Sequence, residues 1–195
     1  VGTISSGHYG VYLCTTNFSA TMNKSAISHD PGYFGRYIKL VGEEDFTVAL
    51  QKATHELETI DISKWIAVGD RTYAPGKWTV HDIVQHAIDT ERIFCYRALR
   101  FARNDATPLR GFSQDDFAAH TTAREIPVDK LWAEWKALRH STELMFGGFN
   151  DEMLLHRGRC SEIEMSALAI GFTLIGHQRH HLGIIHDLYV PLAGK

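Results

Sequence analysis

Four stretches of the chain repeat apolar residues at steps of three and four, the spacing that places side chains on one face of an α-helix. The stretches cover residues 46–60, about 79–103, 127–148 and about 164–189. Each is long enough for several helical turns, and each carries one main apolar stripe. We therefore expect an all-α fold in which four long helices share a core, as in a four-helix bundle.

Residues at the ends of these stretches support the same assignment. Thr79 is a capping residue, Asp82 follows three positions later, and Trp78 is placed to pack back onto the first helical turn. A short additional helix is expected at residues 113–119, inside the long second connection. No segment alternates apolar and polar residues for long, apart from a hint at residues 72–73, so no substantial strand is expected.

Residues 1–31 differ from the rest because they are rich in Ser, Thr, Gly and Asn and have no apolar period. The apolar run at residues 10–14 is too short for a secretory signal, and no Lys or Arg precedes it. We expect a loosely ordered arm over residues 1–31, followed by one domain at residues 32–195. Met22 is one candidate for the natural start of the chain.

Composition narrows the class of protein. The 195 residues include 44% hydrophobic and 22% charged residues, which suits one globular domain. The net charge of −3 argues against nucleic-acid binding, and no run of 18 apolar residues suggests a membrane span. The three cysteines are widely spaced and form no CxxC motif, so a reducing cytoplasm is the expected location.

The chain contains 12 histidines, and two of them occupy core steps of the fourth helical stretch. His177 and His181 are four residues apart, so they lie one turn apart on one helix face. They are either core histidines satisfied by hydrogen bonds or a pair of metal ligands. Two adjacent buried imidazoles each need a partner, and a metal ion would serve both neutral rings at once. The residues alone favour the ligand pair.

Three phrases resemble the DinB-like superfamily: YAPGKWTVHDIVQHAIDTER at residues 73–92, YRALR at residues 96–100, and GHQRHHLGII at residues 176–185. The resemblance spans roughly residues 32–192. It implies a four-helix bundle in up-down-down-up order, usually a homodimer. It also implies one divalent transition metal, commonly nickel, zinc or iron, held by three histidines that match His86, His177 and His181 here.

Two other metal-binding patterns are disfavoured. The zinc-protease motif has Glu directly after the first histidine, but Gln178 follows His177. A ferritin-like di-iron site has Glu-x-x-His on two helices, but neither Glu91 nor Glu164 has a histidine three residues later. A mononuclear site with three imidazole ligands would leave a position open for water or substrate. Nitrogen ligands suit zinc, nickel or iron(II) better than calcium or magnesium.

Three further residues are candidates for a supporting role beside the metal. Asp89 lies one turn after His86 and either orients a ligand or is a solvated surface carboxylate. His180 is expected at the edge of the site. Glu91 occupies a core step, so it needs a partner, and we favour a structural ion pair over a role in the site. The candidate partners are Arg97, Arg100 and Arg179. His81 is expected to be exposed.

Two classes of function remain open at this stage. The first is a metal-dependent enzyme, of the thiol-dependent transferase or hydrolase type, that acts on a small molecule, with a low-molecular-weight thiol as a possible partner. The second is a non-catalytic, stress-associated metal-binding protein, which the lack of an evident general base beside the ligands supports.

The residues themselves support a homodimer less strongly than the resemblance does. The second and fourth helical stretches carry apolar residues beyond one stripe: Ile88, Cys95 and Leu99 on the former, and Leu168, Phe172, Ile175 and Leu182 on the latter. A second apolar row must be covered by something. The candidates are a symmetry mate and the chain's own connection at residues 104–126.

Overall fold

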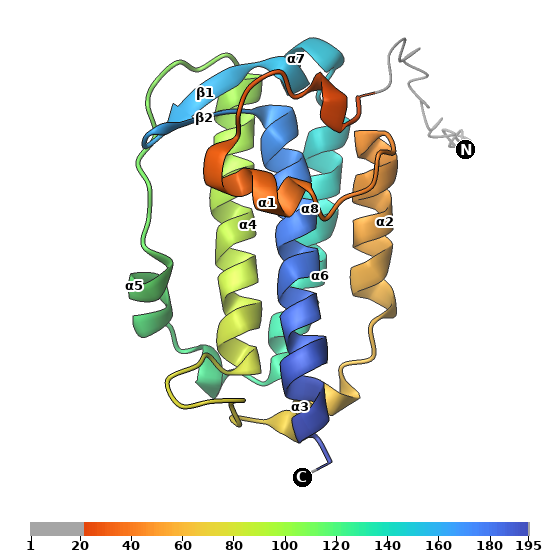
Figure 1. Ribbon diagram of the computed structural model, residues 1–195, viewed down its shortest axis with the longest axis vertical. Coiled ribbons are helices and arrows are strands. Elements are labelled where there is room, and N and C mark those ends of the chain that lie inside the picture. Colours follow the sequence, from red (N-terminus) through yellow and green to blue (C-terminus); the bar gives the residue numbers. More distant parts are fainter. Residues whose placement is uncertain (1–21, 195) are drawn as a thin grey trace, which may run out of the picture.

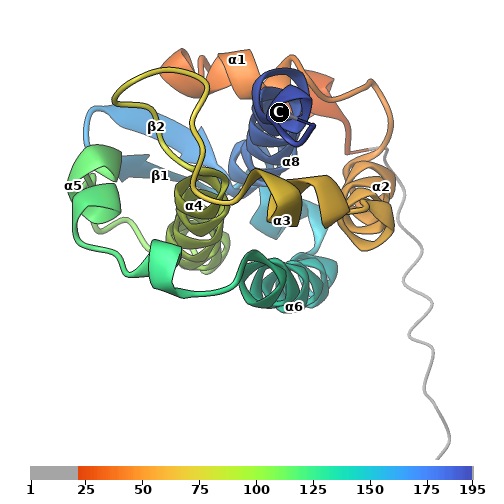
Figure 2. The same ribbon diagram turned by 90° about the horizontal axis from the view of Figure 1, so that it is seen from below.

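The computed structural model describes residues 22–194, and its four long helices stand side by side as a bundle (Figure 1). These helices are α2 (Phe46–Thr59), α4 (Val80–Ala102), α6 (Val128–Gly147) and α8 (Ala167–Ile184). In the view of Figure 1 they run down, up, up and down in chain order. Helices α4 and α2 each pack against both α6 and α8, so α2 and α4 lie diagonally opposite (Figure 2). The predicted four-helix bundle is confirmed.

The caps expected from the sequence are present at the start of α4. The Thr79 hydroxyl accepts from the backbone N–H of Asp82 at 3.2 Å, and the Asp82 carboxylate accepts from the backbone N–H of Thr79 at 2.8 Å. Each side chain thus satisfies a backbone donor that has no partner inside the helix. Helix α6 begins directly after Pro127, as expected for proline at a helix start.

Short elements connect the long helices. The short α-helices are α1 (Gly35–Ile38), α3 (Ser63–Val68), α5 (Gln114–Ala119) and α7 (Asp151–Leu155). The single turns of other type are η1 (Lys24–Ala26), η2 (Gly32–Phe34), η3 (Ala123–Glu125), η4 (Ile185–Tyr189) and η5 (Val190–Leu192). Helix α5 confirms the short helix predicted in the second long connection, and Ser113 caps it.

A β-hairpin replaces the first turn predicted for the fourth helix. Strands β1 (Arg157–Cys160) and β2 (Ile163–Ser166) pair in antiparallel fashion, and α8 begins at Ala167 rather than near Glu164. The prediction of a helix start at Glu164 was therefore wrong by three residues. Each strand has only four residues, which is too short to display a period of two. The hint at residues 72–73 does not form a strand.

The apolar core is divided into two clusters by a polar layer at mid-height of the bundle. One cluster gathers around Phe46, Phe101 and Phe172, and the other gathers around Trp132 and Trp135. Along α4, α6 and α8, buried polar side chains separate the residues of one cluster from those of the other. They are Glu91 on α4, Arg139 and Thr142 on α6, and His177, Gln178 and His181 on α8. Polar groups at this depth need partners, so this layer is where specific chemistry is to be sought.

The second apolar row of α8 is covered by the chain itself. Leu168, Phe172 and Ile175 are fully buried, and the Phe172 ring packs on Phe46 of α2 with ring centroids 5.3 Å apart. Helix α1 also crosses over α8. Helices α1 and α2 therefore cover these three residues, whereas Leu182 is half-buried and Leu99 of α4 is exposed. The homodimer stays a prediction.

The expected arm at residues 1–31 lies outside the described residues as far as position 21. From Met22 onward the chain contacts the bundle: the backbone N–H of Met22 donates to Asp45 at 2.9 Å, and Ala26 and Ile27 pack against the core. The boundary at residue 31 stays a prediction. Among the helices of residues 22–194, none is long and apolar enough to cross a membrane.

Candidate metal centre

Three histidine side chains meet at the polar layer of the bundle. His86 comes from α4, and His177 and His181 come from α8. The Nε2 atom of His177 lies 3.0 Å from Nε2 of His86 and 3.1 Å from Nε2 of His181. One ring nitrogen from each of the three lies within 4.8 Å of the others, so the group could hold a metal ion. Below, these residues are called the histidine triad.

Helix packing holds the triad together. His177 and His181 are one turn apart on the face of α8 that packs against α4, and this contact brings His86 to them. The Trp78 ring lies 5.0 Å from the His86 ring, and the Tyr37 ring of α1 lies 5.1 Å from the His177 ring. Aromatic neighbours from two other segments therefore restrict the orientation of these two imidazole rings.

Burial keeps the three rings neutral. It lowers the pKa of His86 to about 4 and that of His181 to about 2, and it holds the pKa of His177 well below the usual value. The neighbouring triad members add to the shift for His177 and His181, because charges of like sign repel. A neutral imidazole nitrogen carries either a proton or a lone pair, and metal coordination needs the lone pair.

The arrangement fits a metal ion better than it fits hydrogen bonds alone. The Nε2 atom of His177 contacts two other ring nitrogens, yet one nitrogen has either one proton or one lone pair and can direct it at only one of them. Three nitrogens bound to one tetrahedral zinc at about 2.0–2.1 Å would lie about 3.3 Å apart, close to the two distances observed. An all-imidazole donor set suits zinc, nickel or iron(II).

The structure places the three supporting candidates differently. His180 lies at the edge of the triad, with its ring 5.0 Å from that of His181 and 5.5 Å from that of Tyr37. The Asp89 carboxylate accepts a hydrogen bond from Gln85 at 2.9 Å rather than contacting the triad. Burial raises the pKa of Asp89.

Glu91 forms a buried ion pair, but its partner is Arg139 of α6. Its two carboxylate oxygens accept from Nε and Nη2 of Arg139, both at 2.8 Å, and also from Trp135 and Thr142. Arg139 in turn contacts Gln178, directly after His177. The predicted partners Arg97, Arg100 and Arg179 were therefore wrong, because the choice depends on how α4 and α6 align.

His81 is a second correction, because its side chain is only 11% exposed and lies 3.8 Å from Asp70. The position of a residue around a helix predicts its exposure only if no loop packs over that face. Here the loop before α4 covers the His81 side chain.

A cavity of about 290 Å³ opens beside His86 and His177. Thr90, Phe94 and Arg97 of α4 line it, and aromatic side chains from η2 and from the second long connection close it. These residues were not among the site residues predicted from the sequence. The available signal was their spacing, since positions 86, 90, 94 and 97 fall on one face of a helix.

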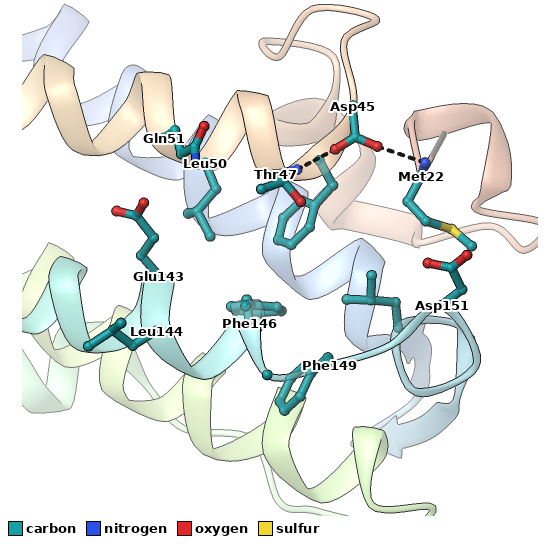
Figure 3. Close-up of a pocket in the computed structure, with 14 residues that line it drawn as sticks. Met22, Asp45, Thr47, Leu50, Gln51, Glu143, Leu144, Phe146, Phe149 and Asp151 are labelled. Carbon is teal, nitrogen blue, oxygen red and sulfur yellow. Dashed lines mark hydrogen bonds between the residues drawn. The ribbon is translucent and has the colours of Figure 1, made fainter. Parts of the chain in front are cut away.

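A larger cavity of about 860 Å³ lies elsewhere, where the start of α2 meets the end of α6 (Figure 3). Its lining includes Phe46, Phe146 and Phe149, and Asp45 there accepts hydrogen bonds from the backbone of Met22 and Thr47. No member of the histidine triad lines it, so its volume does not make it the metal centre.

Comparison with known proteins agrees with this architecture. Among solved structures, YfiT from Bacillus subtilis, described as a probable metal-dependent hydrolase with an unusual four-helix bundle topology, superposes with a TM-score of 0.59 at 16% identity. The match covers 83% of this chain and 88% of YfiT. A mycothiol-dependent maleylpyruvate isomerase matches with a TM-score of 0.50 at 13% identity, over 80% of this chain and 60% of the isomerase.

Because the sequence identities are low, both similarities show the fold alone. No curated protein matches the chain by sequence. The family model of the DinB superfamily matches residues 50–185, which include the whole of α4, α6 and α8 and all three triad histidines. The chain therefore belongs to the DinB superfamily.

Proposed function

We propose that this protein is a metal-dependent enzyme of the thiol-dependent transferase or hydrolase type, which acts on a small molecule. The proposed metal ligands are His86, His177 and His181, and the metal is one divalent ion of nickel, zinc or iron per chain. The carrying observation is that three neutral imidazole nitrogens converge beside a cavity of small-molecule size. One structural relative is described as metal-dependent and another as mycothiol-dependent, which supports the same direction.

A metal ion at this position would supply chemistry by lowering the pKa of a bound water or thiol, which creates a nucleophile near neutral pH. The chain's own residues prepare that environment. Burial holds the ligands neutral, and the rings of Tyr37 and Trp78 pack against His177 and His86 and shield them from bulk water. Three protein ligands leave a coordination position to which a substrate in the cavity has access.

The alternative is a non-catalytic metal-binding protein with a role in stability or stress. The observation in its favour concerns carboxylates: Glu91 is held by Arg139, Trp135 and Thr142, and Asp89 is bonded to Gln85. Neither carboxylate is directed at the triad as a general base. The enzyme proposal does not need one if the nucleophile is activated by the metal alone.

Exchange of the open coordination position separates the two proposals. Protein purified without an affinity tag would be stripped of metal, reloaded with Co²⁺ and titrated with 2-mercaptoethanol, while its visible absorption spectrum is recorded. An enzyme site should take up the thiol and change the spectrum. A spectrum that stays constant up to millimolar thiol would reject the thiol-dependent enzyme and favour a closed binding site.

Two further predictions stay open as parts of this proposal. A homodimer is proposed from family membership, and light scattering distinguishes it from a 22.0 kDa monomer. A cytoplasmic location is proposed from the cysteine pattern, in which Cys95 and Cys160 are both free.

A further inference from the structure

Arg97 is a buried cation that has no acidic partner among residues 22–194. Its side chain is 6% exposed, and it stacks near Phe94 and Phe112, with its guanidinium carbon 5.1 and 5.7 Å from the two ring centroids. Nearby arginines of α4 are paired, Arg92 with Glu134 and Arg100 with Asp105. Within residues 22–194, Arg97 forms no such ion pair, and its one hydrogen bond goes to the backbone carbonyl of Arg110 at 3.1 Å.

This arrangement leaves most donors of Arg97 without a hydrogen bond to residues 22–194. A guanidinium has five N–H donors, and only one of those of Arg97 has a partner among the described residues. Burial also lowers the pKa of Arg97, since the charged form is poorly solvated. A carboxylate would resolve both problems, because it accepts two parallel hydrogen bonds from a guanidinium and neutralises its charge.

A second polar side chain lines the same cavity and has no hydrogen-bond partner in the described part of the chain. Thr90 is 4% exposed, and its hydroxyl forms no hydrogen bond with any described residue. Around the axis of α4, Thr90 and Arg97 lie about 40° and 20° from His86, so the three share one face. The Arg97 guanidinium lies 5.1 Å from the ring centroid of Phe94, which is one turn nearer to Thr90 along α4. All three residues line the cavity of about 290 Å³.

Aromatic side chains form much of the remaining wall of the cavity, and Gly111, Gln114, Cys160, Ser161 and Ile163 complete it. The aromatic lining comes from Tyr33 and Phe34 of η2, Phe94 of α4 and Phe112 of the second long connection. A volume of 290 Å³ is at the small end of the range for ligand cavities, which is roughly 300–1,000 Å³. A charged group at one end and apolar rings along the sides describe a small organic acid with an apolar body.

We infer that the cavity binds a small organic acid whose carboxylate pairs with Arg97 and accepts a hydrogen bond from Thr90, with its apolar body directed toward the triad. This inference rests on the proposed function, because it names the substrate class of the same site. It does not distinguish a carboxylate on the substrate from one on a small thiol co-substrate, since both present the same group.

Calorimetric titration of the metal-loaded full chain with benzoate and with benzamide tests the inference. The two probes have nearly the same shape, but only benzoate carries a charge. We expect benzoate to bind at least about tenfold more tightly than benzamide, since hydrogen bonds to charged groups are the stronger ones. Arg97→Met should remove this preference, and Thr90→Val should weaken benzoate binding by about threefold or more. The matched control is Arg100→Met, which removes a paired cation of the same helix and should leave benzoate binding unchanged.

Three results would overturn the inference: no benzoate binding to folded protein, equal binding of the two probes, or unchanged benzoate affinity in Arg97→Met. If Arg97→Met fails to fold, Arg97→Lys takes its place, because it keeps the charge but loses the paired donors and should bind benzoate more weakly than the wild type. Repeating the titration with 3-mercaptopropionate and with its methyl ester shows whether a thiol acid also uses Arg97.

The same titration on metal-stripped protein separates this inference from the proposed function. If benzoate binding disappears with the metal but persists in Arg97→Met, the carboxylate binds the metal and the inference fails alone. If the chain binds no metal but still binds benzoate through Arg97, the metal-dependent function fails while the acid site stands.

Discussion

Gly176, one position before a proposed ligand, is the point at which α1 crosses α8. A Cβ atom at this position would lie 1.9 Å from the backbone oxygen of Tyr37, so only glycine permits the observed approach. The close approach matters for the site because the Tyr37 ring packs on His177 at 5.1 Å between centroids. A residue without a side chain thus positions an aromatic side chain over the triad.

We expect Gly176→Ala to lower the free energy of unfolding by about 1–3 kcal/mol, because α1 must shift to make room for the methyl group. Gly183→Ala is the matched control on the same helix, where the added methyl group would meet no described atom within 4 Å. The control should be neutral or stabilising by up to about 1 kcal/mol, since Ala is the better helix former. Urea denaturation measures both, and equal effects at the two positions would contradict the account.

The residue scale also shows what sequence reasoning could reach. The proposed ligand pair His177 and His181 followed from helical spacing, because four residues make about one turn. His86 needed the resemblance, since nothing in its own neighbourhood indicates which helix it will face. Glu91 was recognised as a buried carboxylate from its core step, but Arg139 is 48 positions away and its proximity depends on how two helices align.

At the scale of elements, the Glu91–Arg139 ion pair links α4 to α6. Both side chains are almost fully buried, at 2% and 1% exposed. Removing one partner would leave a buried charge without compensation. We expect Glu91→Ala to cost about 3–5 kcal/mol of unfolding free energy, measured by urea denaturation.

The matched control for this pair is Glu134→Ala, which breaks the exposed pair of Arg92 with Glu134 between the same two helices. Its cost should be at most about 1 kcal/mol, because water already solvates both charges. Similar costs for the two substitutions would show that the buried layer does not hold the helices together.

The capping carboxylate of α4 makes the stability of this helix depend on pH. Burial by itself would raise the pKa of Asp82, but hydrogen bonds from Arg124 and Thr79 outweigh burial and lower it. The stabilisation is therefore present above the unfolded-state pKa of about 3.9 and is lost as pH falls through the lower pKa of the folded state. The free energy of unfolding of the wild type should exceed that of Asp82→Asn by about 1 kcal/mol at pH 7.

Urea denaturation at several pH values measures this difference, which should shrink as pH falls below about 4. The exposed Asp129 in the first turn of α6 supplies the control, and Asp129→Asn should show a smaller difference from wild type. A difference in unfolding free energy between wild type and Asp82→Asn that grows as pH falls would contradict the lowered pKa of Asp82.

Elements differed in how visible they were in the sequence. The long helices were predicted with boundaries close to those observed, because each buries a stripe that repeats over at least 14 residues. The hairpin of β1 and β2 was missed, because four residues per strand give no period to detect. Its strand β2 ends in Ser166, whose hydroxyl caps α8, so the hairpin determines where the helix of His177 and His181 begins.

At the scale of the whole molecule, the segment just before the predicted domain is part of the packed body. The backbone N–H of Phe46 donates to Met22 at 2.8 Å, and His29 accepts from the backbone N–H of Ser166 at 3.3 Å. We expect a chain that starts at residue 32 to melt at a lower temperature than one that starts at residue 22. Thermal unfolding of both truncated chains checks this, and identical midpoints would restore the boundary at residue 31.

The central proposal for the whole molecule is that the bundle holds a transition metal between α4 and α8. The most direct measurement is the metal content of untagged protein, by elemental mass spectrometry after equilibration with nickel, zinc or iron(II) and removal of free ions. We predict about one ion per wild-type chain, loss of most of it in His181→Ala, and retention in His140→Ala, which removes an exposed histidine paired with Glu58. Folded wild-type protein that binds no metal, or equal metal content in His181→Ala, would contradict the account.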